Sequence, residues 1–474
     1  MSVVSQSIAK AENRFAPLAI CGVVSILLFA GLLRALGVSL VVPALVFGVA
    51  ALVWIALRYT IPALGVVLAL MSIFPLAFIL AKFFGPPYIA SLEGCDRVAL
   101  LVIACILWKR NGVKLVAADW FLLAAFALAL IRLSFGGELI NLLADFGFII
   151  AYAAGRVTPL SVERQRLWAE RAVWIVAVLS ILGMVEIFVL GQGPRAILYS
   201  TSETAFASNG ALSESFAADS SIFRETSTMI SPPFFALLCM VALIIWWVYL
   251  RSTWPALIIG AGMICAVTRS AWIGTALAIT LLAFRMKQKK RLIPYASLAI
   301  ALFVASIPFL GMTDYLTKTK SNDEASAQYH QVTLNEGLQY VIEHPLGSGP
   351  GNYEHPLNSK HSVVSTTGAP WIESTYLKIA AEYGVVVGVC FAGLVIFAGR
   401  AIWVQWTHLG HTAIGILIGF GLAMIVAPLN AEFALASWIW FPVGLAVRSA
   451  TNSSLPPKGS IPNVLTSAGQ TAGG

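Results

Sequence analysis

The side chains best suited to chemistry in this sequence gather in a polar stretch near residue 350. The stretch reads EHPLGSGPGNY over 343–353 and places His344 beside Gly347, Gly349 and Gly351. A histidine titrates near neutral pH and can move a proton, and the backbone N–H groups of a glycine-rich turn can bind a phosphate. The glycine spacing does not match the dinucleotide fingerprint, and no strand pattern precedes it. The alternative is therefore that His344 is a structural histidine in a loop and takes no part in proton transfer.

Two arginines offer binding of an anion. Arg269 lies between two apolar runs, and a charge inside such a run costs about 2.5 to 3.5 kcal/mol on insertion scales. We therefore expect it at a turn, in a water-filled cavity or paired. Arg224 precedes Pro232 and Pro233, which suit the first turn of a helix, where free N–H groups attract anions. The alternatives are purely structural roles: Arg269 would end a helix at a hairpin turn, and Arg224 would lie at the membrane interface, paired with Glu225.

A carboxylate adds a second candidate for proton transfer. Glu373 stands at the start of an apolar run, where it could act as a base or serve only as a first-turn acid favoured by the helix dipole. The other histidines of this stretch, at 330, 355 and 361, have no zinc spacing. The six cysteines have no metal-ligand spacing either, so we expect neither a metal site nor a disulfide framework.

The composition of the chain indicates the class of fold that positions these side chains. Hydrophobic residues make up 59% of the 474 residues and charged residues 11%, with a mean hydropathy of +0.85. No soluble domain of this size could bury so much apolar surface. Apolar runs of about 17 to 25 residues recur, close to the roughly 20 that cross a bilayer, and they lack the alternation of a barrel strand. The sequence predicts an all-α, polytopic integral membrane protein.

The apolar runs give about 12 to 14 transmembrane helices, since short runs can tilt or be re-entrant. The predicted segments are 15–33, 35–57, 61–81, 98–108, 119–132, 139–154, 172–190, 233–250, 254–268, 271–284, 292–312, 375–399, 411–428 and 434–448.

Basic residues between the runs predict the orientation. The strongest cluster has five Lys and Arg residues within 285–291, and the positive-inside bias places such clusters in the cytoplasm. Both termini are then cytoplasmic, and 191–232 and 313–374 lie on the outer side. This topology accounts for most of the net charge of +8. We expect no nucleic-acid partner, because aromatic residues are not interleaved with the basic clusters.

The chain divides into four parts on this reading. We expect N-terminal transmembrane helices and the start of the first outer loop over 1–219, and a core over 220–399 that contains the outer loop 313–374. C-terminal helices follow over 400–449. The last part, 450–474, is rich in Ser, Pro, Gly and Thr and is predicted to be disordered.

Several of these motifs together resemble the O-antigen ligase and polymerase superfamily. They are Arg224 before a Thr- and Pro-rich helix entry, TRSAW at 268–272, HPLGSGPGNY at 344–353, and ESTYL at 373–377 followed by EYGVVVG at 382–388. Their order and topology match over about residues 220–395, while the N-terminal half is similar only as a set of apolar spans.

The resemblance implies a GT-C-like membrane glycosyltransferase in the bacterial inner membrane. It implies a polyprenyl-diphosphate-linked glycan as donor, a growing glycan or lipid A core as acceptor, and polysaccharide assembly proteins as further partners, with no metal or other cofactor. Carried over by motif, Arg224 and Arg269 would hold the donor diphosphate, with Gly349 and Gly351 beside them, and His344 would act on the acceptor hydroxyl. Many relatives have His-Asn where this chain has Glu373-Ser374. The base therefore stays open between His344, Glu373 or neither, and the departure slightly favours a polymerase.

Two other classes stay open at this stage. A secondary transporter or lipid-linked glycan flippase would place a functional acid near the bilayer midplane, and Asp145 and Glu186 are the clearest candidates. The third class is a structural scaffold of a polysaccharide assembly complex, for which substitution of the outer-face residues would be silent.

Overall fold

The structure is a computed structural model of the whole chain. It describes residues 60–73, 95–191, 227, 229, 231–290, 292–294, 331, 334–352, 374–426 and 433–453. Every regular element within these ranges is helical. The predicted fold class, an all-α polytopic membrane protein, is confirmed.

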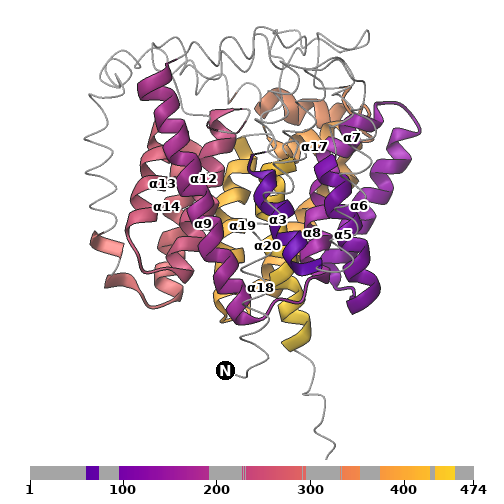
Figure 1. The fold of residues 1–474 in the computed structure, drawn as a ribbon. Helices are drawn as coiled ribbons and strands as arrows, with labels where there is room; N and C mark the ends of the chain where they lie inside the picture. The colour runs from indigo at the N-terminus through magenta and orange to yellow at the C-terminus, as the bar shows by residue number, and fades with distance from the viewer. Residues whose placement is uncertain are drawn as a thin grey trace, which may run out of the picture.

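The helices form an upright bundle with their long axes roughly parallel (Figure 1). In chain order they are α3 (Thr60–Met71), α5 (Cys95–Asn111), α6 (Ala117–Leu133), α7 (Leu139–Phe146), α8 (Phe148–Val157), α9 (Val162–Val185) with the π-turn η2 (Glu186–Leu190), α12 (Pro232–Tyr249), α13 (Trp254–Cys265), α14 (Arg269–Arg285), α17 (Thr375–Tyr383), α18 (Val385–Trp403), α19 (His408–Val426) and α20 (Phe433–Ser453). Residues 334–343 are also helical.

Five helices of the described residues are long and apolar enough to span a membrane. They are Val162–Leu190, Pro232–Tyr249, Val385–Trp403, His408–Ile425 and Phe433–Thr451, and α7 with α8, bent by 43°, would make a sixth. The predicted total of 12 to 14 also counts segments outside the described residues, such as 15–33 and most of 292–312.

Several predicted boundaries differ from the structure, and three of them bear on the fold. The span predicted at 375–399 is two helices that break at Gly384, whose φ is +97°. The span predicted from 172 begins ten residues earlier, because Ser161 accepts a hydrogen bond from the Arg164 N–H and caps α9. The tail predicted as disordered from 450 begins as the last turn of α20, which ends at Ser453.

Basic residues meet at one end of the bundle. Arg448 in α20 donates from Nη1 to the Arg156 carbonyl of α8 at 2.9 Å. At the end of α14, Arg285 donates to the carbonyls of Trp403 and Gln405, just after α18. Gln405 in turn donates to the Ala446 carbonyl of α20. Segments that the charge pattern assigned to one side of the membrane therefore share one end, which we call the basic end.

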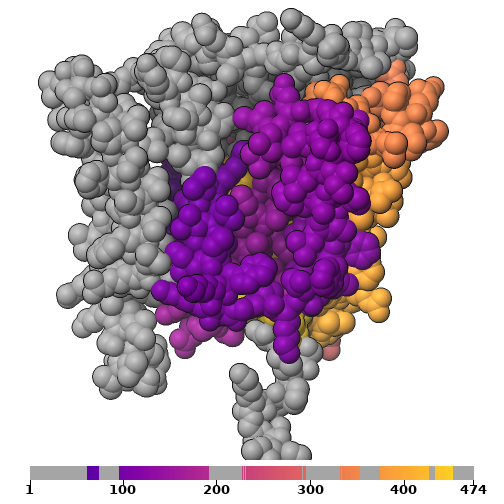
Figure 2. Space-filling model, turned by 90° about the vertical axis from the view of Figure 1, so that its right-hand side faces the viewer, coloured from indigo at the N-terminus to yellow at the C-terminus, as the bar shows by residue number. Residues whose placement is uncertain are grey.

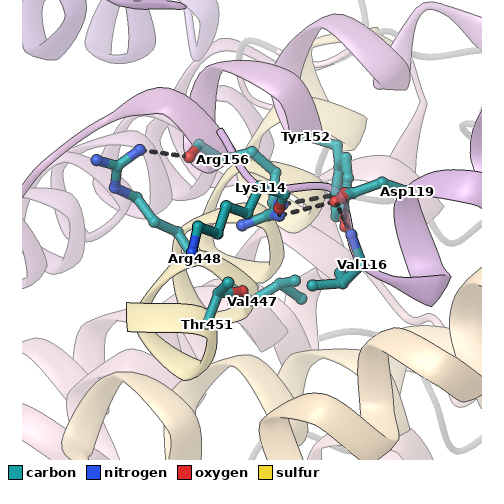
Figure 3. Close-up of polar contacts among 8 residues, drawn as sticks. All are labelled: Lys114, Val116, Asp119, Tyr152, Arg156, Val447, Arg448 and Thr451. Atoms are coloured by element: carbon teal, nitrogen blue, oxygen red, sulfur yellow. Dashed lines mark hydrogen bonds and ion pairs between the residues drawn. The ribbon is translucent and has the colours of Figure 1, made fainter. Parts of the chain in front are cut away.

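A buried ion pair holds this end together (Figure 3). Arg156 Nη2 and Nε donate to the two carboxylate oxygens of Asp119 at 2.7 and 3.0 Å, and the Tyr152 hydroxyl donates to the same carboxylate at 2.9 Å. Both charged side chains are buried. Such a bidentate pair, with further hydrogen bonds, joins the start of α6 to the end of α8.

Exposed tryptophans mark the same end. Five of the six exposed tryptophans in the described residues lie there, while Trp174 lies in the middle of α9: Trp108 near the end of α5, Trp120 near the start of α6, Trp254 at the start of α13, and Trp403 and Trp406 around the α18–α19 connection. Tryptophan is enriched where a membrane meets water, because its ring is apolar and its N–H is polar. The tryptophans therefore place one membrane surface at the basic end.

The packing of α14 against α19 identifies the opposite end of the bundle. The two helices are antiparallel: a Cβ on Gly274 would meet the Gly419 carbonyl at 2.9 Å, and one on Gly415 would meet Leu282 at 2.8 Å. The start of α14 thus lies beside the end of α19, away from the basic end. We call this the polar-loop end, because the predicted outer segments 191–232 and 313–374 begin or finish at it.

Close helix contacts at glycines fix the centre of the bundle. A side chain on Gly155 of α8 would collide with the Phe441 carbonyl of α20, and one on Gly444 would collide with the Tyr152 carbonyl. Small residues of this kind let membrane helices approach backbone to backbone. The Phe148 ring packs beside Trp440 at 4.8 Å between centroids, so α8 and α20 are closely packed along this contact.

Candidate functional site

The glycine-rich turn after His344 docks onto a helix break. The N–H groups of Ser348 and Gly349 donate to the carbonyls of Ala381 and Glu382, both at 2.8 Å. In return the Val385 N–H, at the start of α18, donates to the Pro345 carbonyl at 2.9 Å. Residues 345–352, which we call the glycine turn, therefore pair with the end of α17 and the start of α18 through backbone groups.

Glycine is required where the two backbones touch. Gly347 and Gly349 have φ of +80° and +103°, values that L side chains rarely adopt. A Cβ on Gly347 would meet the Glu382 carbonyl at 2.6 Å, and one on Gly349 would collide with the Gly136 carbonyl. The glycine spacing thus reflects close packing on two sides.

The second side is the connection between α6 and α7. Arg132, in the last turn of α6, donates from Nη2 to the Gly347 carbonyl at 2.8 Å, and the Glu138 N–H donates to the Pro350 carbonyl at 3.0 Å. The Gly351 N–H donates to Glu382 Oε2 at 3.1 Å. The glycine turn is therefore held between two helix connections that are far apart in the sequence.

These contacts give Gly349 and Gly351 a different role from the expected one. The sequence suggested that their N–H groups could bind a phosphate, but both N–H groups donate to Glu382. Their acceptors lie about thirty residues further along the chain, so the local spacing could not reveal them. In this conformation the two glycines position the turn, and an anion at this end needs other donors.

A buried charge cluster beneath the turn was not predicted. Lys378 of α17 forms an ion pair with Asp145 of α7 at 2.8 Å, and the Tyr383 hydroxyl donates to the other oxygen of the same carboxylate at 2.9 Å. All three side chains are buried. Lys378 and Tyr383 flank the residues that accept from the glycine turn, so the cluster ties the broken helix to α7. The sequence signals were Asp145, an acid within an apolar run, and Lys378, a lysine within another, but nothing indicated that the two pair.

His344 lies where the helix of residues 334–343 ends. Its side chain is exposed, stacks on the Tyr340 ring at 4.2 Å between centroids, and places Nδ1 3.2 Å from the Tyr340 carbonyl. A carbonyl oxygen only accepts, so this contact favours the tautomer with the proton on Nδ1. Nε2 then carries the lone pair and is the nitrogen able to take a proton.

Arg269 occupies the first position of α14. Its side chain is exposed, and the turn before it is tight, since Val267 has φ of +47°. The Trp272 indole donates to the Met263 carbonyl at 3.0 Å and closes the hairpin between α13 and α14. The expected turn is confirmed.

The structure brings this arginine and the glycine turn to the same end of the bundle. Ser374, which caps α17, donates from Oγ to the Met424 carbonyl at 3.4 Å, and Met424 is near the end of α19, beside the start of α14. Arg269, Ser374 and the glycine turn are therefore all at the polar-loop end. Arg224 and Glu373, the other two expected site residues, lie outside the described residues.

Comparison with known proteins agrees with the motifs. Residues 254–392, less than a third of the chain, match a family model described as O-antigen ligase. The matched range runs from α13 into α18 and includes Arg269, His344 and the glycine turn. It confirms the resemblance to the O-antigen ligase and polymerase superfamily and supports a membrane-embedded glycosyltransferase of this type, with a lipid-linked glycan donor and an acceptor as substrates. A search of curated proteins finds no match.

Replacing Gly349 by Ala tests the docking of the turn. The added methyl group would meet the Gly136 carbonyl in a backbone conformation strained by about 1 to 2 kcal/mol, so we expect a clear fall in the thermal midpoint of the purified protein, followed by tryptophan fluorescence. Gly112→Ala is the matched control: Gly112 also has positive φ, but nothing lies within 4 Å of its Cβ position. Equal losses in both variants would contradict close docking.

Proposed function

We propose that this chain transfers or polymerises a glycan from a polyprenyl-diphosphate donor at the outer face of the bacterial inner membrane. The observation that carries the proposal is the common location of Arg269 and the His344 segment at the polar-loop end, away from the basic end. With the basic end in the cytoplasm, as the positive-inside bias indicates, both chain termini are cytoplasmic and the reaction takes place outside.

Arg269 is suited to hold the donor diphosphate. It stands at the first position of α14, where the backbone N–H groups of the first turn and the helix dipole favour an anion. A guanidinium group binds phosphate through two parallel hydrogen bonds. Cleavage of the sugar–phosphate bond leaves negative charge on the diphosphate, so a donor fixed in advance stabilises the transition state. We assign Arg224 as the second guanidinium, and the pair would take the place of a divalent cation.

His344 is suited to take the proton of the acceptor. In the proposed reaction the acceptor hydroxyl oxygen bonds to the anomeric carbon, its proton passes to Nε2 of His344, and the diphosphate leaves with the electrons of the broken bond. A displacement from the opposite face inverts the anomeric centre. Glu373 is the alternative base. Gly349 and Gly351 contribute by holding the turn that follows His344.

Of the two acids that a proton-coupled carrier could use, Asp145 and Glu186, the first is engaged in the structure. Both oxygens of Asp145 accept hydrogen bonds, one from Lys378 and the other from Tyr383. A carboxylate whose two oxygens are both engaged by buried side chains suits an element that fixes a helix, so Asp145 is disfavoured as the functional acid of a transporter or flippase. The acceptor we propose is a growing glycan chain or a lipid A core sugar, with polysaccharide assembly proteins as further partners.

Arg269→Lys tests diphosphate binding. The change keeps the charge and removes the planar fork, so we expect transfer to fall by about 10²-fold or more, the range for loss of one transition-state donor. Transfer is measured with a polyprenyl-diphosphate-linked glycan and the purified protein in lipid nanodiscs. Arg251→Lys, an exposed arginine between α12 and α13, is the matched control and should retain activity. Near-normal transfer by Arg269→Lys would remove the arginine from the site.

His344→Ala separates proton transfer from binding. If His344 is the base, kcat should fall by about 10² to 10⁴-fold while donor affinity changes little. His408→Ala is the control, because His408 is exposed at the basic end, where it packs beside Tyr249. A rise in KM for the donor with unchanged kcat would reassign His344 to binding, and no effect on either would favour Glu373.

A further inference from the structure

The helix of residues 334–343 lies across the end of the bundle. It appears in Figure 1 as the orange helix lying crosswise above the upright helices, near α17 and α7. Val341 packs against Ala380 and Ala381 of α17, with Tyr340 and Leu377 beside them. This contact fixes which side of the helix faces the bundle.

The helix is amphipathic about this contact. At roughly 100° per residue, Leu338 and Ile342 lie about 60° to 100° to one side of Val341, and Tyr340 and His344 lie by a similar angle to the other side. The side facing away from the bundle carries polar residues, Asn335, Gln339 and Glu343, all exposed.

The apolar flank is open in the structure. Leu338 is 49% exposed, Ile342 70% and Leu346, just beyond the helix, 80%. Leu334, one turn before Leu338, is exposed as well. Three aliphatic side chains at spacings of four residues on the helix, with Leu346 just after it, form an apolar edge typical of a helix that lies in a membrane interface.

The turn after this helix is bonded to the connection between two helices that expose apolar side chains. Through Glu138 and Pro350 the glycine turn is bonded to the α6–α7 connection, where Phe135 is exposed, and Leu139 and Ile140 at the start of α7 are exposed as well. Further down, α6 exposes Ile131, Leu123 and Trp120 along one face. Figure 2 views this side, with the orange residues 334–352 at the upper right, beside the upper part of the purple helices. Exposed apolar side chains are thus present along α6 from Trp120 to Ile131 and on α7, the two helices whose connection is bonded to the glycine turn.

We propose that the helix of residues 334–343 lies in the membrane interface, and that its apolar flank of Leu334, Leu338 and Ile342, together with Leu346 just after it, inserts among the phospholipids of the leaflet at the polar-loop end. Phospholipid is the occupant because the turn after the helix is bonded to the connection between α6 and α7, two helices that expose apolar side chains, and because the polar side of the helix faces away from the bundle, toward water. The lipid contact and the Val341 contact together fix the rotation of the helix. His344 is then held at the membrane surface on the flank opposite the lipid.

The inserted flank can be tested by photo-cross-linking. Benzoylphenylalanine in place of Ile342, in the full chain in nanodiscs of phosphatidylethanolamine and phosphatidylglycerol, should give on irradiation a protein adduct with the mass of one phospholipid. Benzoylphenylalanine in place of Gln339, on the water-facing side, is the matched control and should give a several-fold lower yield. Leu346, in the turn after the helix, is the second position and also tolerates a large side chain, should the Ile342 variant fail to fold.

The outcomes divide clearly. A lipid adduct that prefers positions 342 and 346 over 339 supports the proposal. Cross-links from these positions to another part of the chain, or equal lipid yields at 339, would overturn it. The readout requires no glycan transfer, so it is independent of the proposed function.

Discussion

A helix that breaks inside a membrane protein leaves backbone carbonyls that water cannot satisfy, and each one costs several kcal/mol unless the protein supplies a donor. The break at Gly384 meets this constraint with the glycine turn: Ser348 and Gly349 donate to the last carbonyls of α17, and Pro345 accepts from the first N–H group of α18. Neither segment could hold its conformation without the other. The polar stretch that first suggested chemistry is thus also the part that makes the helix break stable.

The position of the candidate site follows from this pairing. The Lys378–Asp145 ion pair and the Tyr383 hydrogen bond attach α17 to α7, and the Arg132 contact attaches the glycine turn to α6. His344 precedes the turn, so these contacts hold the end of its helix at one place on the polar-loop end. Arg269 lies at the same end for a separate reason, the antiparallel packing of α14 against α19.

The sequence predicted what depends on local pattern or composition. The helical membrane fold, the basic end and the start of α12 at Pro232 all follow from hydropathy, charge and the fixed φ of proline. The break at Gly384 was missed because a single glycine barely changes the mean hydropathy of the run around it. The Lys378–Asp145 pair joins residues 233 apart, and no local pattern encodes such a contact. The packing role of Gly349 and Gly351 was missed for the same reason. Their spacing suggested a phosphate site, but their hydrogen-bond acceptor, Glu382, lies about thirty residues further along the chain. Arg224 and Glu373 fall outside the described residues and remain predictions.

Hydrogen exchange at the backbone of the glycine turn tests this account most directly. The full chain in nanodiscs would be placed in deuterated water, and exchange at Ser348 and Gly349 would be resolved by peptide fragmentation and compared with exchange in α17. Because both N–H groups donate to carbonyls of α17, the account predicts that they exchange as slowly as the helix amides and open together with them. Complete exchange of Ser348 and Gly349 at the shortest labelling time, with α17 still protected, would contradict it.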